Sequence, residues 1–309
     1  MSLLQTGIVF RSTGSWYEVK MPDGNFLTCK LKGNFKIKGL RTTNPLAVGD
    51  VVDVKLLPDK ETGLIVNIHN RENYIIRKAT KLSKATHIIA ANIHQAVLIA
   101  SLEKPRTSTG FIDRFLVTAE AYHIPVTIVF NKYDLYNEAV RENLKKLMRA
   151  YEQAGYTCLI TSAKEGFHVE EFKNILKDEI SLLSGHSGVG KSALINKIDA
   201  KLNLKEGEIS QVHLKGKHTT TFSEMYSLAF GGYIIDTPGI KEFGLVRFDK
   251  TELGQRFPEI RRYMSACRFN NCLHVNEPGC AVIQAVERGD IPEFRYRNYL
   301  NMLEDIENT

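Results

Sequence analysis

The chain has 309 residues, of which 43% are hydrophobic and 25% charged, and its formal net charge is +6. This length allows two or three domains with buried cores. No apolar run approaches the roughly 18 residues that span a bilayer, and residues 1–10 do not have the pattern of a signal peptide. We therefore expect a cytoplasmic protein without membrane contact. The five cysteines are poor evidence for disulfides in such a compartment, because the cytosol is reducing.

The first 72 residues predict a small β-barrel. Five β-rich runs follow one another at residues 8–10, 16–19, 26–29, 48–54 and 63–68. A Pro22-Asp23-Gly24 turn separates the second run from the third. Strands this short and closely spaced favour a barrel of the OB type, a fold that commonly binds nucleic acid. Fold alone does not establish function, so RNA binding is an inference at this point.

A basic stretch lies at the end of this first region. Residues 73–110 contain six basic side chains against one acid, Glu103, which leaves a charge of +5. The six are Arg77, Lys78, Lys81, Lys84, Lys104 and Arg106. Such an excess suits a polyanion such as RNA, and a solvated charged linker is the alternative.

From residue 93 onward, expected strands and helices alternate, which is the pattern of a mostly parallel sheet covered by helices. The expected strands are 95–101, 126–130, 156–161, 180–184 and the pair 221–230 and 233–235. The expected helices are 110–122, 137–154 with Gly155 as its stop, and 191–198. We divide the chain into an OB-type domain (1–72), an α/β domain (73–248) and a C-terminal helical domain (249–309).

A phosphate-binding loop is expected between the strand at 180–184 and the helix at 191–198. Its residues are Gly185, His186, Ser187, Gly188, Val189, Gly190, Lys191 and Ser192. Backbone N–H groups of the loop and the helix N-terminus would bind the β- and γ-phosphates. Lys191 would bridge phosphate oxygens, and Ser192 would ligate Mg²⁺. The alternative, a chance glycine-rich turn, does not account for the strand and helix on either side.

A guanine-reading motif, Asn131-Lys132-Tyr133-Asp134, follows the strand at 126–130. The Asp134 carboxylate can accept hydrogen bonds from N1–H and the exocyclic amine of guanine. Asn131 can fix the loop, and Lys132 can lay its methylenes over the ring. Ser162-Ala163-Lys164, after the next strand, can supply a backbone N–H for the guanine O6. Alone, the first motif is also a common polar turn, but two base-reading motifs at strand ends favour GTP over ATP.

A metal-and-switch motif follows the last apolar strand. In Asp236-Thr237-Pro238-Gly239, Asp236 can hold Mg²⁺ through water and the Gly239 amide can meet the γ-phosphate. The first switch belongs in 216–221, where Thr219 or Thr220 should complete the Mg²⁺ shell, and we favour Thr220. A loop rich in Ser and Thr that only caps a strand is the alternative.

The residue after Gly239 is Ile240, where Ras-like enzymes carry a glutamine that orients the attacking water. Isoleucine neither donates nor accepts, so we expect slow hydrolysis unless another group acts. His218 is our candidate catalytic residue, because a neutral imidazole can position water or take a proton. A surface histidine in a mobile loop is the alternative.

Three cysteines and a histidine fall within one short C-terminal stretch: Cys267, Cys272, His274 and Cys280. Four such ligands suit one tetrahedral structural Zn²⁺ and leave no open coordination position. Free thiols beside an unrelated histidine are the alternative. The other cysteines, Cys29 and Cys158, fall in apolar alternating segments and are expected to be buried thiols.

The last expected helix, 292–306, carries four side chains suited to RNA: Arg295, Tyr296, Arg297 and Tyr299. This helix either presents them to RNA or is an ordinary packed helix, and the sequence does not separate the two interpretations.

The guanine reader precedes the phosphate loop, whereas in an ordinary GTPase it follows. Together with the barrel and the Cys-x4-Cys-x-His-x5-Cys cluster, this order resembles the RsgA family of circularly permuted bacterial GTPases over almost the entire chain. The most specific strings are Gly185–Ser192, His218–Thr221 and Asp236–Ile240.

The resemblance implies a GTPase that converts GTP and water to GDP and phosphate, binds Mg²⁺ with GTP and uses a histidine at the position of His218. It implies weak turnover stimulated by the 30S subunit, a role late in that subunit's maturation, and contacts of the barrel and zinc domain with 16S ribosomal RNA. We also expect a monomer.

Three alternatives stay open at this stage: a nucleotide-gated RNA-binding scaffold with little hydrolysis, a GTPase of large-subunit assembly, and a P-loop kinase. Intact Ser192 and Asp236 argue against the scaffold, and the guanine reader argues against the kinase. A further hypothesis is that ordering of the loop after Asp236 by the γ-phosphate repositions the zinc domain.

Overall fold

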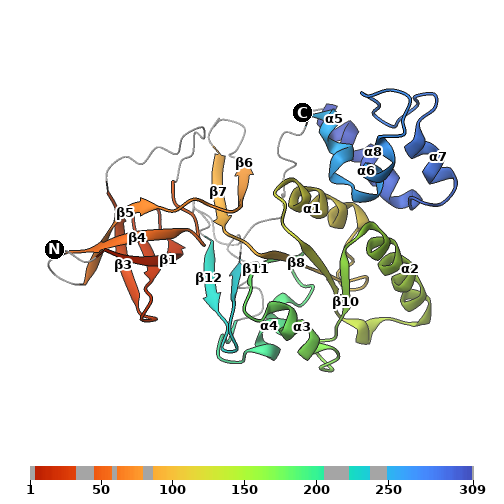
Figure 1. The fold of residues 1–309 in the computed structure, drawn as a ribbon. Helices are drawn as coiled ribbons and strands as arrows, with labels where there is room; N and C mark the ends of the chain where they lie inside the picture. The colour runs from red at the N-terminus through yellow and green to blue at the C-terminus, as the bar shows by residue number, and fades with distance from the viewer. Residues whose placement is uncertain are drawn as a thin grey trace, which may run out of the picture.

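The computed structural model describes residues 4–32, 45–57, 61–78, 86–204, 223–236 and 249–307. Within these ranges the barrel and the C-terminal helices lie at opposite ends of a central α/β domain (Figure 1). No helix in the described ranges is both long and apolar enough to cross a membrane.

The N-terminal barrel contains five strands: β1 (Leu4–Ser12), β2 (Tyr17–Lys20), β3 (Phe26–Leu31), β4 (Val51–Leu56) and β5 (Thr62–Ile68). They pair in the order β1-β2-β3-β5-β4, and β4 pairs back with β1, which closes the barrel. Alternate residues of each strand point inward, so Val9, Val19 and Val54 are fully buried. The predicted OB-type barrel is confirmed.

Cys29 also lies in the barrel core, where burial raises the pKa of its thiol to about 12. Cys158, partly buried in the α/β domain, has its pKa raised to about 12 for the same reason. Cys29 is therefore a buried thiol, as predicted, whereas Cys158 is only partly buried.

The described residues of the α/β domain form six strands in the order β10-β9-β8-β11-β13-β12. Their bounds are β8 (Gln95–Ala100), β9 (Val126–Phe130), β10 (Thr157–Ile160), β11 (Ile180–Ser184), β12 (Glu224–Ser227) and β13 (Tyr233–Asp236). All pairings are parallel except β12 with β13. The mostly parallel sheet is thus confirmed.

Four helices cover the two faces of this sheet: α1 (Thr109–Ala121), α2 (Glu138–Ala154), α3 (Val169–Leu176) and α4 (Lys191–Ile198). Alternation along β8 shows the arrangement, because Leu98 packs with α1 and α2 whereas Val97 and Ile99 pack with α3 and α4. Helix α2 begins with the Asn137 side chain accepting from the Val140 N–H and ends at Gly155, as expected.

Some elements were not anticipated from the sequence. Strands β6 (Tyr74–Lys78) and β7 (Thr86–Ala91) form a separate antiparallel pair within the basic stretch. Helix α3 was also missed. The apolar parts of β6 and β7 are short, and their burial comes from packing: Ile75 and Ile88 are buried, and Val48 of the barrel bridges to Ala90.

The barrel joins the α/β domain at a sheet edge. Strand β1 pairs antiparallel with β12, so one sheet of eleven strands runs through both domains. The Phe10 ring packs edge-on against Tyr233 with centroids 5.5 Å apart. Lys20 Nζ donates to Ser227 Oγ at 3.1 Å.

The C-terminal module contains α5 (Lys250–Leu253), α6 (Pro258–Met264), α7 (Ala281–Glu287) and α8 (Glu293–Glu307), with a 3₁₀ turn, η2 (Gly254–Arg256), between α5 and α6. Its core includes Val117, which belongs to α1 of the α/β domain. The module therefore packs directly on α1, beside which it lies in Figure 1.

Candidate nucleotide site and metal centre

The loop between β11 and α4 has the backbone that a phosphate-binding loop needs. Gly185 and Gly190 have φ of +141° and +96°. A Cβ on Gly185 would lie 2.2 Å from the Ile99 carbonyl oxygen, and one on Gly190 would lie 2.4 Å from Asn131 Nδ2. Only glycine fits both positions. Lys191 Nζ donates to the carbonyls of Gly185 and His186 at 2.7 and 2.9 Å, so its ammonium lies across the loop.

Asn131 joins the guanine reader to both neighbouring loops. It is almost fully buried, and its Nδ2 donates to the Val189 carbonyl of the phosphate loop at 2.9 Å. Its Oδ1 accepts from Thr161 Oγ1 at 3.1 Å and from the Ala163 N–H at 3.2 Å. One amide side chain therefore connects three motifs that are far apart in the chain.

Asp134, the carboxylate of the guanine-reading motif, is also held in place. Asp134 lies in the 3₁₀ turn η1 (Tyr133–Leu135), and Ser162 Oγ donates to its Oδ1 at 2.7 Å. Lys132 has a left-handed backbone with φ of +66°, and its Nζ donates to the Lys104 carbonyl at 2.5 Å. Lys164 is exposed in the turn that follows Ala163.

The switch residues are placed only in part. Asp236 ends β13 and lies in register with Leu183 of β11, so its backbone is at the strand end nearest the phosphate loop. The predicted roles of His218, Thr219, Thr220 and Gly239 fall on residues outside the described ranges, as do Thr237 and Ile240.

Sequence reasoning missed several contributors to this site. Thr161 could have been found, because it stands at the end of a predicted strand directly before Ser162. Lys104 acts through its backbone carbonyl, which carries no sequence signal. Phe111, in the first turn of α1, packs against His186 of the phosphate loop with ring centroids 3.9 Å apart and the ring planes tilted by 31°. That contact joins positions 75 residues apart in sequence, so no local pattern predicts it.

The four predicted metal ligands come together in the C-terminal module. One ligand atom from each of Cys267, Cys272, His274 and Cys280 lies within 4.8 Å of all the others. His274 Nδ1 faces Cys280 Sγ at 3.4 Å and Cys267 Sγ at 3.6 Å. Burial lowers the pKa of His274, which favours the neutral imidazole that a metal requires. Three sulfurs and one nitrogen at this spacing fit a zinc ion.

Helix α8 supports the metal-binding loop from behind. The hydroxyl groups of Tyr296 and Tyr299 donate to the carbonyls of His274 and Leu273 at 2.7 and 2.6 Å. Arg295 and Tyr299 are buried, so α8 is a packed helix and the RNA-facing interpretation is wrong for these residues. Only Arg297 of the four is well exposed.

Two family models match this chain. The RsgA N-terminal domain matches residues 6–65, and the RsgA GTPase matches residues 68–246, more than half of the chain. The chain belongs to the RsgA GTPase family. It is thus a GTPase, as its motifs predicted.

Relatives in this family are similar over nearly their whole length. The chain is 54% identical to the small ribosomal subunit biogenesis GTPase RsgA 2 of Bacteroides thetaiotaomicron over 97% of both chains. It is 50% identical to RsgA of Flavobacterium psychrophilum, over 98% of this chain and 94% of the relative.

Two solved structures have the same architecture. YjeQ from Thermotoga maritima superposes with a TM-score of 0.81 at 34% identity, covering 99% of this chain and 100% of that one. YloQ, described as a circularly permuted GTPase, superposes with a TM-score of 0.77 at 28% identity, covering 99% and 96%. The permuted order inferred from the motifs is therefore confirmed at the level of the fold.

Proposed function

We propose that this GTPase hydrolyses GTP during late maturation of the small (30S) ribosomal subunit. The observation that carries the chemistry is Asn131, whose side chain bonds both the Val189 carbonyl of the phosphate loop and the Ala163 amide. The role in the subunit is supported by similarity over nearly the full length to proteins named for small-subunit biogenesis. An RNA scaffold without hydrolysis, or a large-subunit GTPase, has no comparable support.

The geometry supports the following residue roles. Asp134 accepts from the guanine edge, while Ser162 Oγ donates to its carboxylate. Lys164 presents its backbone N–H to O6, and the Ala163 N–H, which donates to Asn131 Oδ1, orients the turn. The methylenes of Lys132 cover the base. The phosphates lie over residues 185–192 at the N-terminus of α4, where Lys191 exchanges its two carbonyl partners for phosphate oxygens.

The donors for Mg²⁺ are Ser192, Thr220 and Asp236. Ser192 is buried in the first turn of α4 directly after Lys191, which fits a ligand of a phosphate-bound ion. A bound Mg²⁺ neutralises charge that develops on the phosphate oxygens. The protein itself positions the phosphates through the loop N–H groups, Lys191 and the Gly239 amide.

We propose His218 as the group that positions the attacking water in place of a glutamine. His218→Ala should lower kcat by about 100-fold, in the range of general base catalysis, and leave GDP affinity intact. Single-turnover hydrolysis measures the first quantity and fluorescent GDP binding the second. His69→Ala, on the barrel surface, is the matched control. Wild-type single-turnover rates in the His218 variant would remove this residue from the mechanism.

The Asp134 carboxylate can be tested by changing which base fits it. Asp134→Asn replaces an acceptor with a donor, so affinity for GDP should fall about 100-fold while affinity for xanthosine diphosphate, with a carbonyl at position 2, should rise. Asp290→Asn, in the C-terminal module, should change neither. Titration of each variant with both nucleotides measures these affinities. An unchanged preference for GDP in the Asp134 variant would contradict the assignment of Asp134.

We infer one structural Zn²⁺ per chain, bound by Cys267, Cys272, His274 and Cys280. All four positions are protein ligands, so the ion would have no open position for catalysis. Its contribution is to hold the loop between α6 and α7, which has little apolar core of its own.

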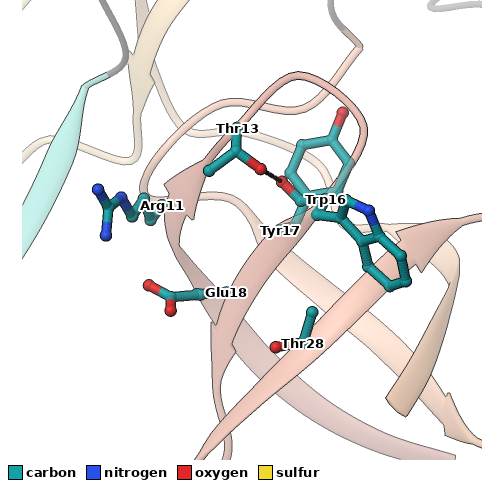
Figure 2. Close-up of a pocket in the computed structure, with 6 residues that line it drawn as sticks. All are labelled: Arg11, Thr13, Trp16, Tyr17, Glu18 and Thr28. Atoms are coloured by element: carbon teal, nitrogen blue, oxygen red, sulfur yellow. Dashed lines mark hydrogen bonds between the residues drawn. The ribbon is translucent and has the colours of Figure 1, made fainter.

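RNA contact by the barrel is supported by the outer face of β1, β2 and β3. A shallow pocket of about 330 Å³ lies there, lined by Arg11, Thr13, Trp16, Tyr17, Glu18 and Thr28 (Figure 2). Trp16 is 38% exposed, and Lys30 Nζ lies 4.1 Å from its ring centroid. An exposed aromatic beside cations suits stacking of an unpaired base and contact with phosphate. We propose 16S ribosomal RNA as the ligand of this face and of the C-terminal module.

The function as a whole is tested by GTP turnover of the cytoplasmic monomer that we propose. The rate should rise several-fold or more with purified 30S subunits and stay at the basal value with 50S subunits. Stimulation by 50S alone would redirect the proposal to large-subunit assembly, and stimulation by neither would favour the scaffold.

A further inference from the structure

Tyr136 lies just after the guanine reader and joins two loops through its hydroxyl group. The hydroxyl donates to the Asn131 carbonyl at 2.7 Å and accepts from the Leu102 N–H at 2.8 Å. Ser101 Oγ lies 3.3 Å from the same oxygen. The Tyr136 side chain is 3% exposed, so these contacts are made away from water.

The two loops joined by Tyr136 both touch the proposed nucleotide site. Asn131 opens the guanine reader. Leu102 opens the loop from β8 to α1, whose Lys104 carbonyl accepts from Lys132 Nζ at 2.5 Å. The same loop packs on the phosphate loop, since a Cβ on Gly188 would lie 3.4 Å from Pro105 Cδ. The loop from β8 to α1 therefore anchors the lysine that covers the base.

We propose that Tyr136 is a positioning residue for guanine recognition. Its hydroxyl ties the reader to the loop from β8 to α1 and so sets where Lys132 is anchored and how Asp134 faces the base. The inference rests on the proposed guanine site.

The hydroxyl matters more than the ring. In the described part of the chain, we find no second hydrogen bond to the Leu102 N–H or the Asn131 carbonyl. A phenylalanine would fill the same space but leave both buried backbone groups unpaired, and an unpaired buried group is costly. Burial raises the pKa of Tyr136, against the opposing hydrogen bonds from Ser101 and Leu102, so the phenol stays neutral and keeps its proton for Asn131.

The test compares GDP with inosine diphosphate, which lacks the 2-amino group that Asp134 reads. In Tyr136→Phe the Kd for GDP should rise about tenfold. The ratio of the Kd for inosine diphosphate to that for GDP should fall at least about threefold toward one, because base-specific contacts are lost.

Tyr156→Phe is the matched control. The Tyr156 hydroxyl is buried in the same domain, and the described residues offer it no hydrogen-bond partner. Its removal should leave both Kd values unchanged. A Tyr136 variant that loses thermal stability but keeps the wild-type Kd for GDP and the wild-type ratio would overturn the proposal, because a purely structural role predicts that result.

A double-mutant comparison tests whether the effect of Tyr136 on GDP binding depends on Lys132. In a Lys132→Ala background, Tyr136→Phe should weaken GDP binding by only about threefold, because the anchored side chain is already gone and the effect through Asp134 remains. A full tenfold loss of GDP affinity in that background would show that Tyr136 does not act through Lys132.

Hydrogen exchange of the wild-type protein gives a measurement that does not depend on a variant folding. The Leu102 amide should exchange slowly, and more slowly with GDP bound. Fast exchange in both states would contradict the proposal.

If the wild-type protein binds ADP as tightly as GDP, the proposed guanine site is wrong, and this inference is wrong as well. If it prefers GDP and Tyr136→Phe keeps that preference, only this inference falls.

Discussion

The barrel and the C-terminal module are attached to the GTPase domain in different ways. The barrel closes most of its core around residues such as Val19 and Ile65. It meets the GTPase domain along a strand edge and through Phe10 and Val48, which lie in that domain's core. The contacts there include the exposed pair Arg11–Glu224, 3.9 Å apart. The module shares its core with Val117 of α1 and is joined to the GTPase domain by buried charges.

The buried charges centre on Arg295 of α8, which is fully buried. Its guanidinium donates to Asp113 of α1 at 2.6 Å and to Glu259 of α6 at 2.5 and 3.1 Å. Burial opposes the charged form, but the two carboxylates outweigh it, so the pKa of Arg295 stands above its ordinary value. Asn298 and Tyr151 complete the cluster by donating to Asp113 at 2.6 and 2.9 Å.

This difference predicts how far the structure of each region depends on the GTPase domain. We expect the closed barrel to retain its structure when its neighbour is perturbed. We expect the module to lose structure, because α1 completes its core and its buried charge cluster. The difference also bears on the hypothesis that the switch loop moves the module. Helix α1 holds the module through Asp113 and packs Phe111 against His186, so the movement that this hypothesis requires would involve α1.

Loss of the metal should have the largest effect. Cys272→Ala should abolish stoichiometric zinc and unfold the loop between α6 and α7, because structural zinc supplies about 10–16 kcal/mol in small zinc domains. Metal analysis and amide exchange measure the two outcomes. Barrel amides should stay protected, and Cys158→Ala should keep its zinc. A Cys272 variant with full zinc and a protected α7 would refute the assignment.

Disruption of the buried charges should come next. Arg295→Met leaves Asp113 and Glu259 buried without their cation and should cost about 3–5 kcal/mol of unfolding free energy. Arg297→Met is a control on the same helix, because its pair with Glu293 at 2.5 Å is exposed and should contribute under about 0.5 kcal/mol. Urea unfolding measures both. Equal effects would mean that the Arg295 cluster does not secure the module.

The smallest effect is expected at the barrel edge. Arg11→Ala removes an exposed ion pair and should change the unfolding free energy by less than about 0.5 kcal/mol, since backbone pairing of β1 with β12 remains. The same urea titration measures it. A loss comparable to that of Arg295→Met would erase the contrast between the two attachments.

Much of the fold was visible in local patterns. The strand at Val126–Phe130 is apolar except for Thr127, and the glycines of the phosphate loop stand between a strand and a helix. The cysteine spacing likewise predicted four ligands that come within 4.8 Å of one another. By contrast, α3 and the pair β6 and β7 were missed, because their apolar segments are short and their stability comes from packing on other elements.

Residue types and spacing were enough to predict a guanine nucleotide site, a permuted motif order and a cluster of metal ligands, because each motif depends on neighbours in sequence. Tertiary structure alone decided that Arg295 is buried instead of facing RNA, since its partner Asp113 lies 182 residues earlier. It likewise decided that Asn131 bonds Val189 across 58 residues. Such contacts are set by the packing of whole helices and strands. The periodicity of one segment does not indicate which other segment will pack against it.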